Sequence, residues 1–290
     1  MKSVAVHNGI FHADDVLSVA IIKLIYPKLK IIRTRDFEEI IKADFRVDVG
    51  EIYNPETGDF DHHQNEFNEK RKNGIPYASA GLVWRHFGNK LVNSKEAFDY
   101  IDERIIQALD AEDNGVKVYS QEIISPYTLG DVIGSFNPNW QEKNANKDEA
   151  FEGAVLFTIG LLKREIDFAN GIKKAEKIIE ELISKSNGNY LILDSFVPWE
   201  KIVVKNSKIK FVITKSVSND YWNISTVPIK ESSFKNRKDF PRKWAGLRDE
   251  KLAEVTGVND ALFCHKNLFV ASTKSKEGAI KLVELALKEK

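Results

Sequence analysis

Hydrophobic and polar residues alternate in several short segments of the chain, and longer segments have helical spacing. In the first part of the chain this pattern predicts strands at residues 3–7, 30–34 and 45–49. Helical spacing follows the first strand over residues 15–26, and Pro27 ends it. Strands and a helix in this order, with polar residues where the strands end, predict an open, mostly parallel α/β sheet with flanking helices.

Two more helices are predicted before the pattern becomes irregular. Ser79 is placed as the N-cap of the first, which Gly88 ends. Ser94 is placed as the N-cap of the second helix. The apolar residues of this helix lie on one stripe of its surface: Phe98, Ile101, Ile105, Ile106 and Leu109. Residues 116–147 then lack a regular period, which predicts loop with a short strand.

The second half of the chain predicts a long helix followed by a smaller α/β unit. Residues 148–186 are compatible with helix, with a break expected near Asn170 and Gly171. Beyond them the pattern predicts strands at 190–193, 209–214, 221–227, 261–264 and 268–272, and helices near 249–256 and 276–288. We therefore expect two domains, at 1–147 and 190–290, joined by a connecting helical segment at 148–189.

Composition narrows the class of protein. The 290 residues are 42% hydrophobic and 30% charged, which is typical of a folded globular chain. No apolar run is long enough for a membrane span, and the N-terminus lacks the pattern of a signal peptide. Cys264 is the single cysteine, which excludes an internal disulfide and a Cys-rich zinc site. These features predict a cytoplasmic protein with no membrane partner.

Charge is distributed unevenly although the net charge is zero. Residues 1–115 contain 15 Lys and Arg against 20 Asp and Glu, whereas residues 191–290 contain 19 against 12. An acidic half is suited to hold metal ions and a basic half to attract a polyanionic substrate. A Lys-rich solvated surface is the alternative for the basic half.

Four of the six histidines lie in two short acidic clusters. The first cluster follows the first predicted strand and contains His7, His12, Asp14 and Asp15. Its two acids also fit the first turn of the next helix, where the helix dipole favours carboxylates. A structural role is therefore an alternative for one or both of them.

The second cluster and a later acidic segment extend the pattern. Asp48 ends a predicted strand, and the second cluster, Asp61–His62–His63, follows about a dozen residues later. Asp110 and Asp113 end the amphipathic helix and share one of its faces. Carboxylates with imidazoles suit Mn²⁺, Zn²⁺ or Fe²⁺ better than Ca²⁺. Three such groups at the ends of strands and a helix predict one composite metal site.

These motifs carry a resemblance to a known family. The order HNGIFHADD, VDVG, DHHQ and DAEDNG resembles the four-motif pattern of the DHH phosphoesterase superfamily. Within it, the opening HxGxFHxDD and the spelling DHHQ resemble the Myg exonuclease family, often labelled "metal-dependent protein hydrolase". Residues 234–272 resemble that family's Arg-rich, Trp-Gly-Leu and Thr-Gly segment. The resemblance covers most of the chain.

The resemblance implies a DHH-type catalytic domain at 1–147 that binds two divalent metal ions, with Mn²⁺ expected first and Mg²⁺ or Zn²⁺ as alternatives. The expected ligands are His7, His12, Asp14, Asp48, His62 and Asp113, with Asp48 as the bridge. The first motif departs from the superfamily's usual spelling, His, three residues, Asp, one residue, Asp. Whether Asp14 or Asp15 is the ligand therefore stays open.

Three further residues are expected to assist the reaction. His63 is the candidate for contacting a substrate phosphate or protonating the leaving oxygen, with packing under the loop as its structural alternative. Asp61 is expected to orient an imidazole, and Asp110 to support Asp113. His86 is expected to pack within its helix's surroundings rather than bind metal.

The basic second half is expected to bind the substrate. Five residues are candidates for phosphate or base contacts: Arg237, Arg242, Trp244, His265 and Lys266. A basic surface loop with a buried tryptophan is the alternative. The resemblance favours substrate binding, because the family places its substrate cleft between the two domains.

Together these features predict a metal-dependent phosphodiester hydrolase, an exonuclease that shortens RNA or short oligonucleotides from the 3′ end. The polarity and the RNA preference come from the resemblance alone. One alternative is a small substrate, such as pyrophosphate or a cyclic dinucleotide product, and another is a non-catalytic RNA-binding protein with a structural metal site. No HExxH helix, phosphate-binding GxxxxGK[ST] loop or GxSxG motif is present. A homodimer is left open.

Overall fold

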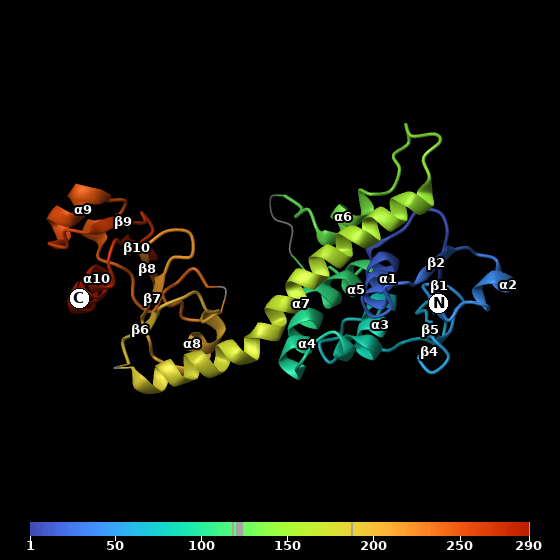
Figure 1. Cartoon of the computed structure of the whole chain (residues 1–290), viewed down its shortest axis with the longest axis horizontal. Coiled ribbons are helices and arrows are strands. Elements are labelled where there is room, and N and C mark those ends of the chain that lie inside the picture. The colour runs from blue at the N-terminus through green and yellow to red at the C-terminus, as the bar shows by residue number, and fades with distance from the viewer. Residues whose placement is uncertain (118, 120–123, 187, 232, 290) are drawn as a thin grey trace. The chain divides into compact units, whose positions relative to one another are not determined.

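The structure, a computed structural model, describes the chain except for residues 118, 120–123, 187, 232 and 290 (Figure 1). The chain divides into two compact units, Met1–Gly171 and Ile172–Lys290. Each unit contains its own five-stranded sheet with helices against it, so the predicted mixed α/β class is confirmed. Among the described residues, no helix is both long and apolar enough to cross a lipid bilayer.

The sheet of the N-terminal unit is mostly parallel. Its strand order is β2-β1-β3-β5-β4, with bounds Lys30–Arg33, Ser3–Val6, Phe45–Val47, Asp59–Phe60 and Tyr53–Asn54. The pairs β1–β2, β1–β3 and β3–β5 are parallel, and β4 alone runs antiparallel to its neighbour. The carboxyl ends of β1, β3 and β5 therefore meet at one edge of the sheet.

Helices of the N-terminal unit pack around α1 (Ala13–Ile25), which lies between α3 (Ser79–Phe87), α5 (Gln107–Asp113) and α6 (Leu129–Gly134) (Figure 1). Most of α1 is buried, from Asp14 to Ile22. This unit also contains α2 (Phe37–Ile40), α4 (Lys95–Ile101) and the first part of α7 (Lys147–Lys185). A 3-10 turn lies at Gly88–Lys90, and a π-helical segment at Asp102–Ile106 joins α4 to α5. Asn137 pairs with both backbone groups of Phe11 at 3.0 and 2.8 Å and so fixes the loop before α1.

Three predictions about these elements need correction. The third strand ends at Val47 rather than 49, because Asp48 has a left-handed backbone with φ 55°. Residues 116–147 contain α6 and, where described, no strand; positions 118 and 120–123 lie outside the described residues. The break near Gly171 is wrong, because α7 (Lys147–Lys185) is continuous. One glycine inside a long helix costs only about 1 kcal/mol relative to alanine.

The C-terminal unit has a mostly antiparallel sheet. Its order is β6-β7-β8-β10-β9, with bounds Tyr190–Leu193, Phe211–Lys215, Trp222–Thr226, Val270–Thr273 and Ala261–Cys264. Only β6 and β7 pair in parallel among these strands. The helices α9 (Asp249–Thr256) and α10 (Lys276–Lys288) match the prediction, whereas α8 (Glu200–Asn206) was not predicted.

Candidate metal centre

Histidines and carboxylates gather where the parallel strands of the N-terminal unit end. His7 follows β1, Asp48 follows β3 and His62 lies two residues beyond β5. Two more elements complete the group: α1 contributes acids from its first turn and α5 contributes its last residue, Asp113. The fold therefore brings together side chains that are more than 100 positions apart in the sequence.

Asp48 lies at the centre of this group. Its Oδ2 atom is 3.4 Å from His7 Nε2. Its Oδ1 atom is 3.6 Å from His62 Nε2 and 3.4 Å from His63 Nδ1. The two oxygens of one carboxylate thus face different sets of imidazoles, which is the arrangement expected of a group that bridges two cations.

Two separate sets of donors share this region, and a third set links them. The first is His7, Asp15 and Asp48, and the second is Asp14, His62 and Asp113. The linking set is Asp48, His62 and His63; within each set the donor atoms lie within 4.8 Å of one another. His7 Nε2 is 3.0 Å from Asp15 Oδ2, and His62 Nε2 is 3.2 Å from Asp113 Oδ2. Donors bound at about 2.0–2.2 Å to one ion are separated by roughly 3.0–3.5 Å. The observed spacings therefore fit coordination.

Two buried atoms of these sets have no hydrogen-bond partner among the described residues: Asp15 Oδ2 and His62 Nε2. The other oxygen of Asp15 accepts hydrogen bonds from the backbone N–H groups of His12, at 3.0 Å, and Val16, at 2.8 Å. A buried polar atom without a partner is costly, and a cation would satisfy both atoms. Imidazole with carboxylate donors fits Mn²⁺, Zn²⁺ or Fe²⁺, and three protein donors per set leave positions open for other ligands.

The acids and histidines alter each other's proton affinity. The close carboxylates of Asp15 and Asp48 raise the pKa of His7 to about 10. Burial alone would lower the pKa of His62, but the close carboxylates of Asp113 and Asp48 outweigh burial and raise it to about 10. Burial, together with the charges of the neighbouring acids, raises the pKa of Asp14. Without a cation, this cluster therefore retains protons that a bound metal ion would displace.

Backbone groups hold the central acids in place. Asp14 accepts hydrogen bonds from the N–H groups of Ser79, at 3.0 Å, and Ala80, at 2.6 Å, at the start of α3. The Ser79 hydroxyl also donates to Asp48 Oδ1 at 3.3 Å. The positive φ of Asp48 is a strained conformation of the kind that surrounding contacts must maintain, and such strain often occurs at functional sites.

His63 stands at the edge of the cluster, with 57% of its side chain exposed. Asp61 lies 2.8 Å from its Nδ1 atom and also accepts the N–H of Glu51 at 2.7 Å. The hydrogen bond to Asp61 raises the pKa of His63. Among the described residues, His63 is the one imidazole within ion-pair distance of Asp61, so Asp61 orients His63. Both residues line a cavity of about 1050 Å³ beside Asp48.

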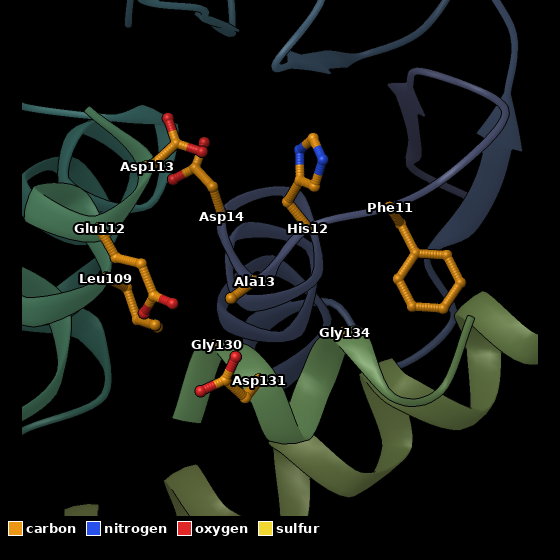
Figure 2. A pocket seen from close by; sticks show the side chains of 10 residues that line it. All are labelled: Phe11, His12, Ala13, Asp14, Leu109, Glu112, Asp113, Gly130, Asp131 and Gly134. Carbon is orange, nitrogen blue, oxygen red and sulfur yellow. The ribbon is translucent and has the colours of Figure 1, made fainter. Parts of the chain in front are cut away.

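A second cavity, of about 470 Å³, is lined by Asp14 and Asp113 together with residues of α5 and α6 (Figure 2). Figure 2 shows the carboxylates of Asp14 and Asp113 directed to the same space as the His12 imidazole. His12 lines both cavities and lies 5.9 Å from His7 between ring centroids, yet it belongs to neither donor set. His12 therefore stands beside both donor sets, and its role as a metal ligand stays a prediction.

Asp110 lies outside the cluster. It is fully buried, forms an ion pair with Arg71 and accepts the N–H of Gly81 at 2.9 Å. Burial raises its pKa to about 7. A side chain at position 81 would collide with Asp110, since an added Cβ would lie 1.9 Å from Oδ2. Asp110 therefore connects α5 to α3 and the loop of Arg71.

The candidate substrate residues of the C-terminal unit are not a single group. Trp244 is 2% exposed and packs on Phe240 in the core, so it has no face free for a base. Arg237 donates hydrogen bonds to three backbone carbonyls where α8 ends, those of Val204, Ser207 and Ile209. These contacts give both residues a structural role.

The other three candidates remain near the surface. Arg242 is exposed in the turn Arg242–Trp244 and lines a small cavity with Lys238 and Lys243. Lys266 is exposed, while His265 is half-buried against Phe269.

His86 packs on Phe60 and Phe87 and belongs to neither donor set, which agrees with its expected structural role.

Sequence reasoning left out two residues that the structure places at the centre. Asp15 was considered only as the alternative to Asp14, whereas both acids reach the cluster, one in each donor set. The sequence signal was the adjacent pair Asp14–Asp15 at the start of α1, because the side chains of neighbouring residues in the first turn of a helix point in different directions. Ser79 was considered only as a helix cap, and nothing in its local pattern indicates its contact with Asp48.

Comparison with known proteins shows which family the chain belongs to. A family model described as "Uncharacterised protein family (UPF0160)", with the short name MYG1_exonuc, matches residues 3–287. A MYG1 protein of Dictyostelium discoideum is 34% identical, with 96% of this chain and 94% of that protein covered. The MYG1 exonuclease of Mus musculus is 30% identical, with 99% and 85% covered. The MYG1 protein YER156C of Saccharomyces cerevisiae is 29% identical, with 99% and 96% covered. The predicted Myg resemblance is thereby confirmed, and the chain belongs to the MYG1 family, UPF0160.

Proposed function

We propose that this protein is a metal-dependent phosphodiester hydrolase of the DHH type, an exonuclease that shortens RNA or short oligonucleotides from the 3′ end. The observation that carries the proposal is the position of Asp48, whose two carboxylate oxygens face two different sets of donors. Relatives named MYG1 exonuclease support a nuclease reaction, since they align with almost the whole chain.

The proposed metal ligands follow the donor sets. His7 and Asp15 would hold one ion, Asp14, His62 and Asp113 would hold the other, and Asp48 would be shared between them. Two divalent ions, Mn²⁺ first, would supply an activated water and stabilise negative charge on the phosphoryl oxygens. The chain itself keeps these donors oriented through Ser79, through the first turn of α1 and through the fixed backbone of Asp48.

His63 is the exposed member of the linking set, and we therefore assign it to the substrate. It is more than half exposed and faces the larger cavity, and its hydrogen bond to Asp61 favours the protonated form. A protonated imidazole there would bind a phosphoryl oxygen or give its proton to the leaving oxygen. The exposed Arg242 and Lys266 remain proposed contacts for the polyanionic chain.

The test is Mn²⁺-dependent degradation of a 5′-labelled short RNA, run beside pyrophosphate. A ladder that shortens from the 3′ end, lost with chelator and in Asp48→Asn and His62→Ala, is the expected result. Asp44→Asn is the matched control, because Asp44 is partly exposed and pairs with Lys2 far from the donors.

Two outcomes would overturn the proposal. Phosphate release from pyrophosphate without RNA degradation would assign a small substrate instead. Tight binding of Mn²⁺ and RNA without turnover of either compound would favour a non-catalytic RNA-binding protein with a structural metal site.

A further inference from the structure

Part of the lining of the larger cavity consists of residues that belong to no donor set. Besides the donors and His63, it is lined by Arg35 and Phe37 from the segment that follows β2. Arg35 is the one Lys or Arg among the described residues that line it. Phe37 is 62% exposed, and Ile10 on the same wall is 68% exposed. A cation and an aromatic ring thus stand together beside a strongly acidic centre.

Arg35 differs from its neighbour Arg33 in what it contacts. The Arg33 side chain is 2% exposed, donates to Gly9 O at 2.8 Å and forms an ion pair with Asp148 at 3.0 Å. Arg35 is exposed and has no ion pair with a described residue. Arg33 therefore stabilises the fold, whereas the guanidinium of Arg35 is available to a ligand.

The backbone that presents these two side chains is fixed. Thr34 N donates to Val6 O at 2.9 Å, and the Thr34 hydroxyl accepts the N–H of Asp36 at 3.0 Å. Asp36 caps α2 by accepting the N–H of Glu38 at 2.9 Å. Ile40, at the end of this helix, packs into a cluster with Ala5, Ala43 and Val49. An exposed ring held by an ordered segment costs little entropy to place against a ligand.

We propose that Arg35 and Phe37 form a nucleotide-binding subsite beside the metal centre. The Phe37 ring stacks on a nucleobase, and the Arg35 guanidinium binds a phosphate of the same substrate. A cavity of about 1050 Å³ is large enough for a nucleotide. The inference deepens and rests on the proposed function, because it assigns base-bearing substrates to the same site and disfavours pyrophosphate, which has nothing to stack.

The test measures binding without turnover. The Mn²⁺-loaded full chain is titrated calorimetrically with AMP and with ribose 5-phosphate, which lacks the base. The wild-type protein is expected to bind AMP about tenfold more tightly than ribose 5-phosphate, which is the affinity gain expected from stacking one base on an aromatic side chain. Phe37→Ala should remove that preference and Phe37→Trp should keep it. Arg35→Ala should weaken both ligands about tenfold and leave their ratio unchanged.

Two matched controls separate these effects from general disturbance. Ile41→Ala removes an exposed apolar side chain at the end of α2, and Arg164→Ala removes an exposed arginine on α7; neither lines this cavity. Both should bind as wild type does. An AMP preference that survives in Phe37→Ala, or unchanged binding in Arg35→Ala, would overturn the subsite.

The same variants distinguish this proposal from the proposed function. A preference for AMP that depends on Phe37, in a protein that degrades no RNA, would support the subsite and reject the nuclease. RNA degradation that proceeds in Phe37→Ala with the wild-type AMP preference would support the nuclease and reject the subsite.

Discussion

Two groups of buried acids in the N-terminal unit are neutralised in different ways. Asp110 is paired with Arg71, which also contacts Asp102 at 3.0 Å, and a backbone N–H satisfies its other oxygen. The acids around Asp48 face imidazoles, backbone donors, the Ser79 hydroxyl and each other, and Asp15 Oδ2 has no hydrogen-bond partner among the described residues. Residues 110 and 113 are three apart on one helix, yet they belong to different groups.

The difference shows how a structural acid can be told from a ligand. A buried carboxylate must be paired, hydrogen-bonded or bound to a cation. A guanidinium is a permanent partner, so Asp110 serves the fold. The acids around Asp48 instead face histidines with raised pKa values and lie beside buried atoms without hydrogen bonds, which is the setting in which we propose a cation as the partner. The predictions below test this distinction.

The largest effect is expected for Asp48→Asn. Losing the shared carboxylate should reduce bound Mn²⁺ from two ions to one or none and lower nuclease activity roughly a thousandfold, since metals supply several kcal/mol of charge stabilisation. Metal content by atomic emission and RNA turnover are the measurements. Asp44→Asn should retain both, and two bound ions with normal turnover in Asp48→Asn would refute the bridging role.

Arg71→Met should leave the metal content unchanged and destabilise the fold. Removing one partner of a buried ion pair leaves Asp110 uncompensated and should cost about 3–5 kcal/mol in the free energy of unfolding. Urea unfolding measures this loss. The double variant Arg71→Met/Asp110→Asn should recover most of it, and equal losses in the single and double variants would show that Arg71 acts by packing instead.

Metal removal should destabilise the wild-type chain by a mass-action effect. At a free Mn²⁺ concentration of about 100 times Kd, the bound state gains about 2.7 kcal/mol. Thermal unfolding with Mn²⁺ and with chelator should therefore give different midpoints. The difference should shrink in Asp48→Asn and persist in Asp44→Asn; midpoints that do not depend on metal would argue against a bound ion.

Asp61→Asn should have a moderate effect that is confined to the reaction. Asp61 orients His63 and belongs to neither donor set. Loss of such an orienting carboxylate typically costs 10- to 100-fold in activity or affinity. RNA turnover should fall by this amount while the Mn²⁺ content stays at the wild-type value. A loss of metal would instead place Asp61 among the ligands.

The smallest effect on stability is expected for Asp44, the surface acid that also serves as the control. Hydrogen bonds from Lys2 and Ser3 lower the pKa of Asp44 to about 2. Because the folded pKa lies below the unfolded one, this stabilisation is present above pH 4 and is lost as pH falls toward 2. Solvent screening limits it to about 1 kcal/mol or less. The free energies of unfolding of the metal-free wild type and of Asp44→Asn should converge as the pH falls toward 2. A difference that does not change with pH would show that the Asp44 pKa does not contribute to stability.

Much of the fold follows from local pattern. Alternation placed β1, which precedes His7, and β3, which precedes Asp48, and the pattern of apolar residues placed α9 and α10. Local pattern did not indicate α8 or α6, which are short and depend on tertiary packing. It also did not show that Asp48 leaves the strand with a positive φ, because that conformation is maintained by contacts with distant segments.

For the candidate site, too, some features follow from local sequence and others depend on tertiary contacts. Local sequence specifies which residue types cluster and where: histidines and acids directly after apolar strands, in a chain that matches the MYG1 family. Which of them meet depends on the tertiary structure. It joins both Asp14 and Asp15 to the donors, pairs Asp110 with Arg71, leaves His12 beside the two donor sets and buries Trp244. The physical reason is that chemical identity is local, whereas burial, orientation and the choice of partner depend on segments far apart in the chain.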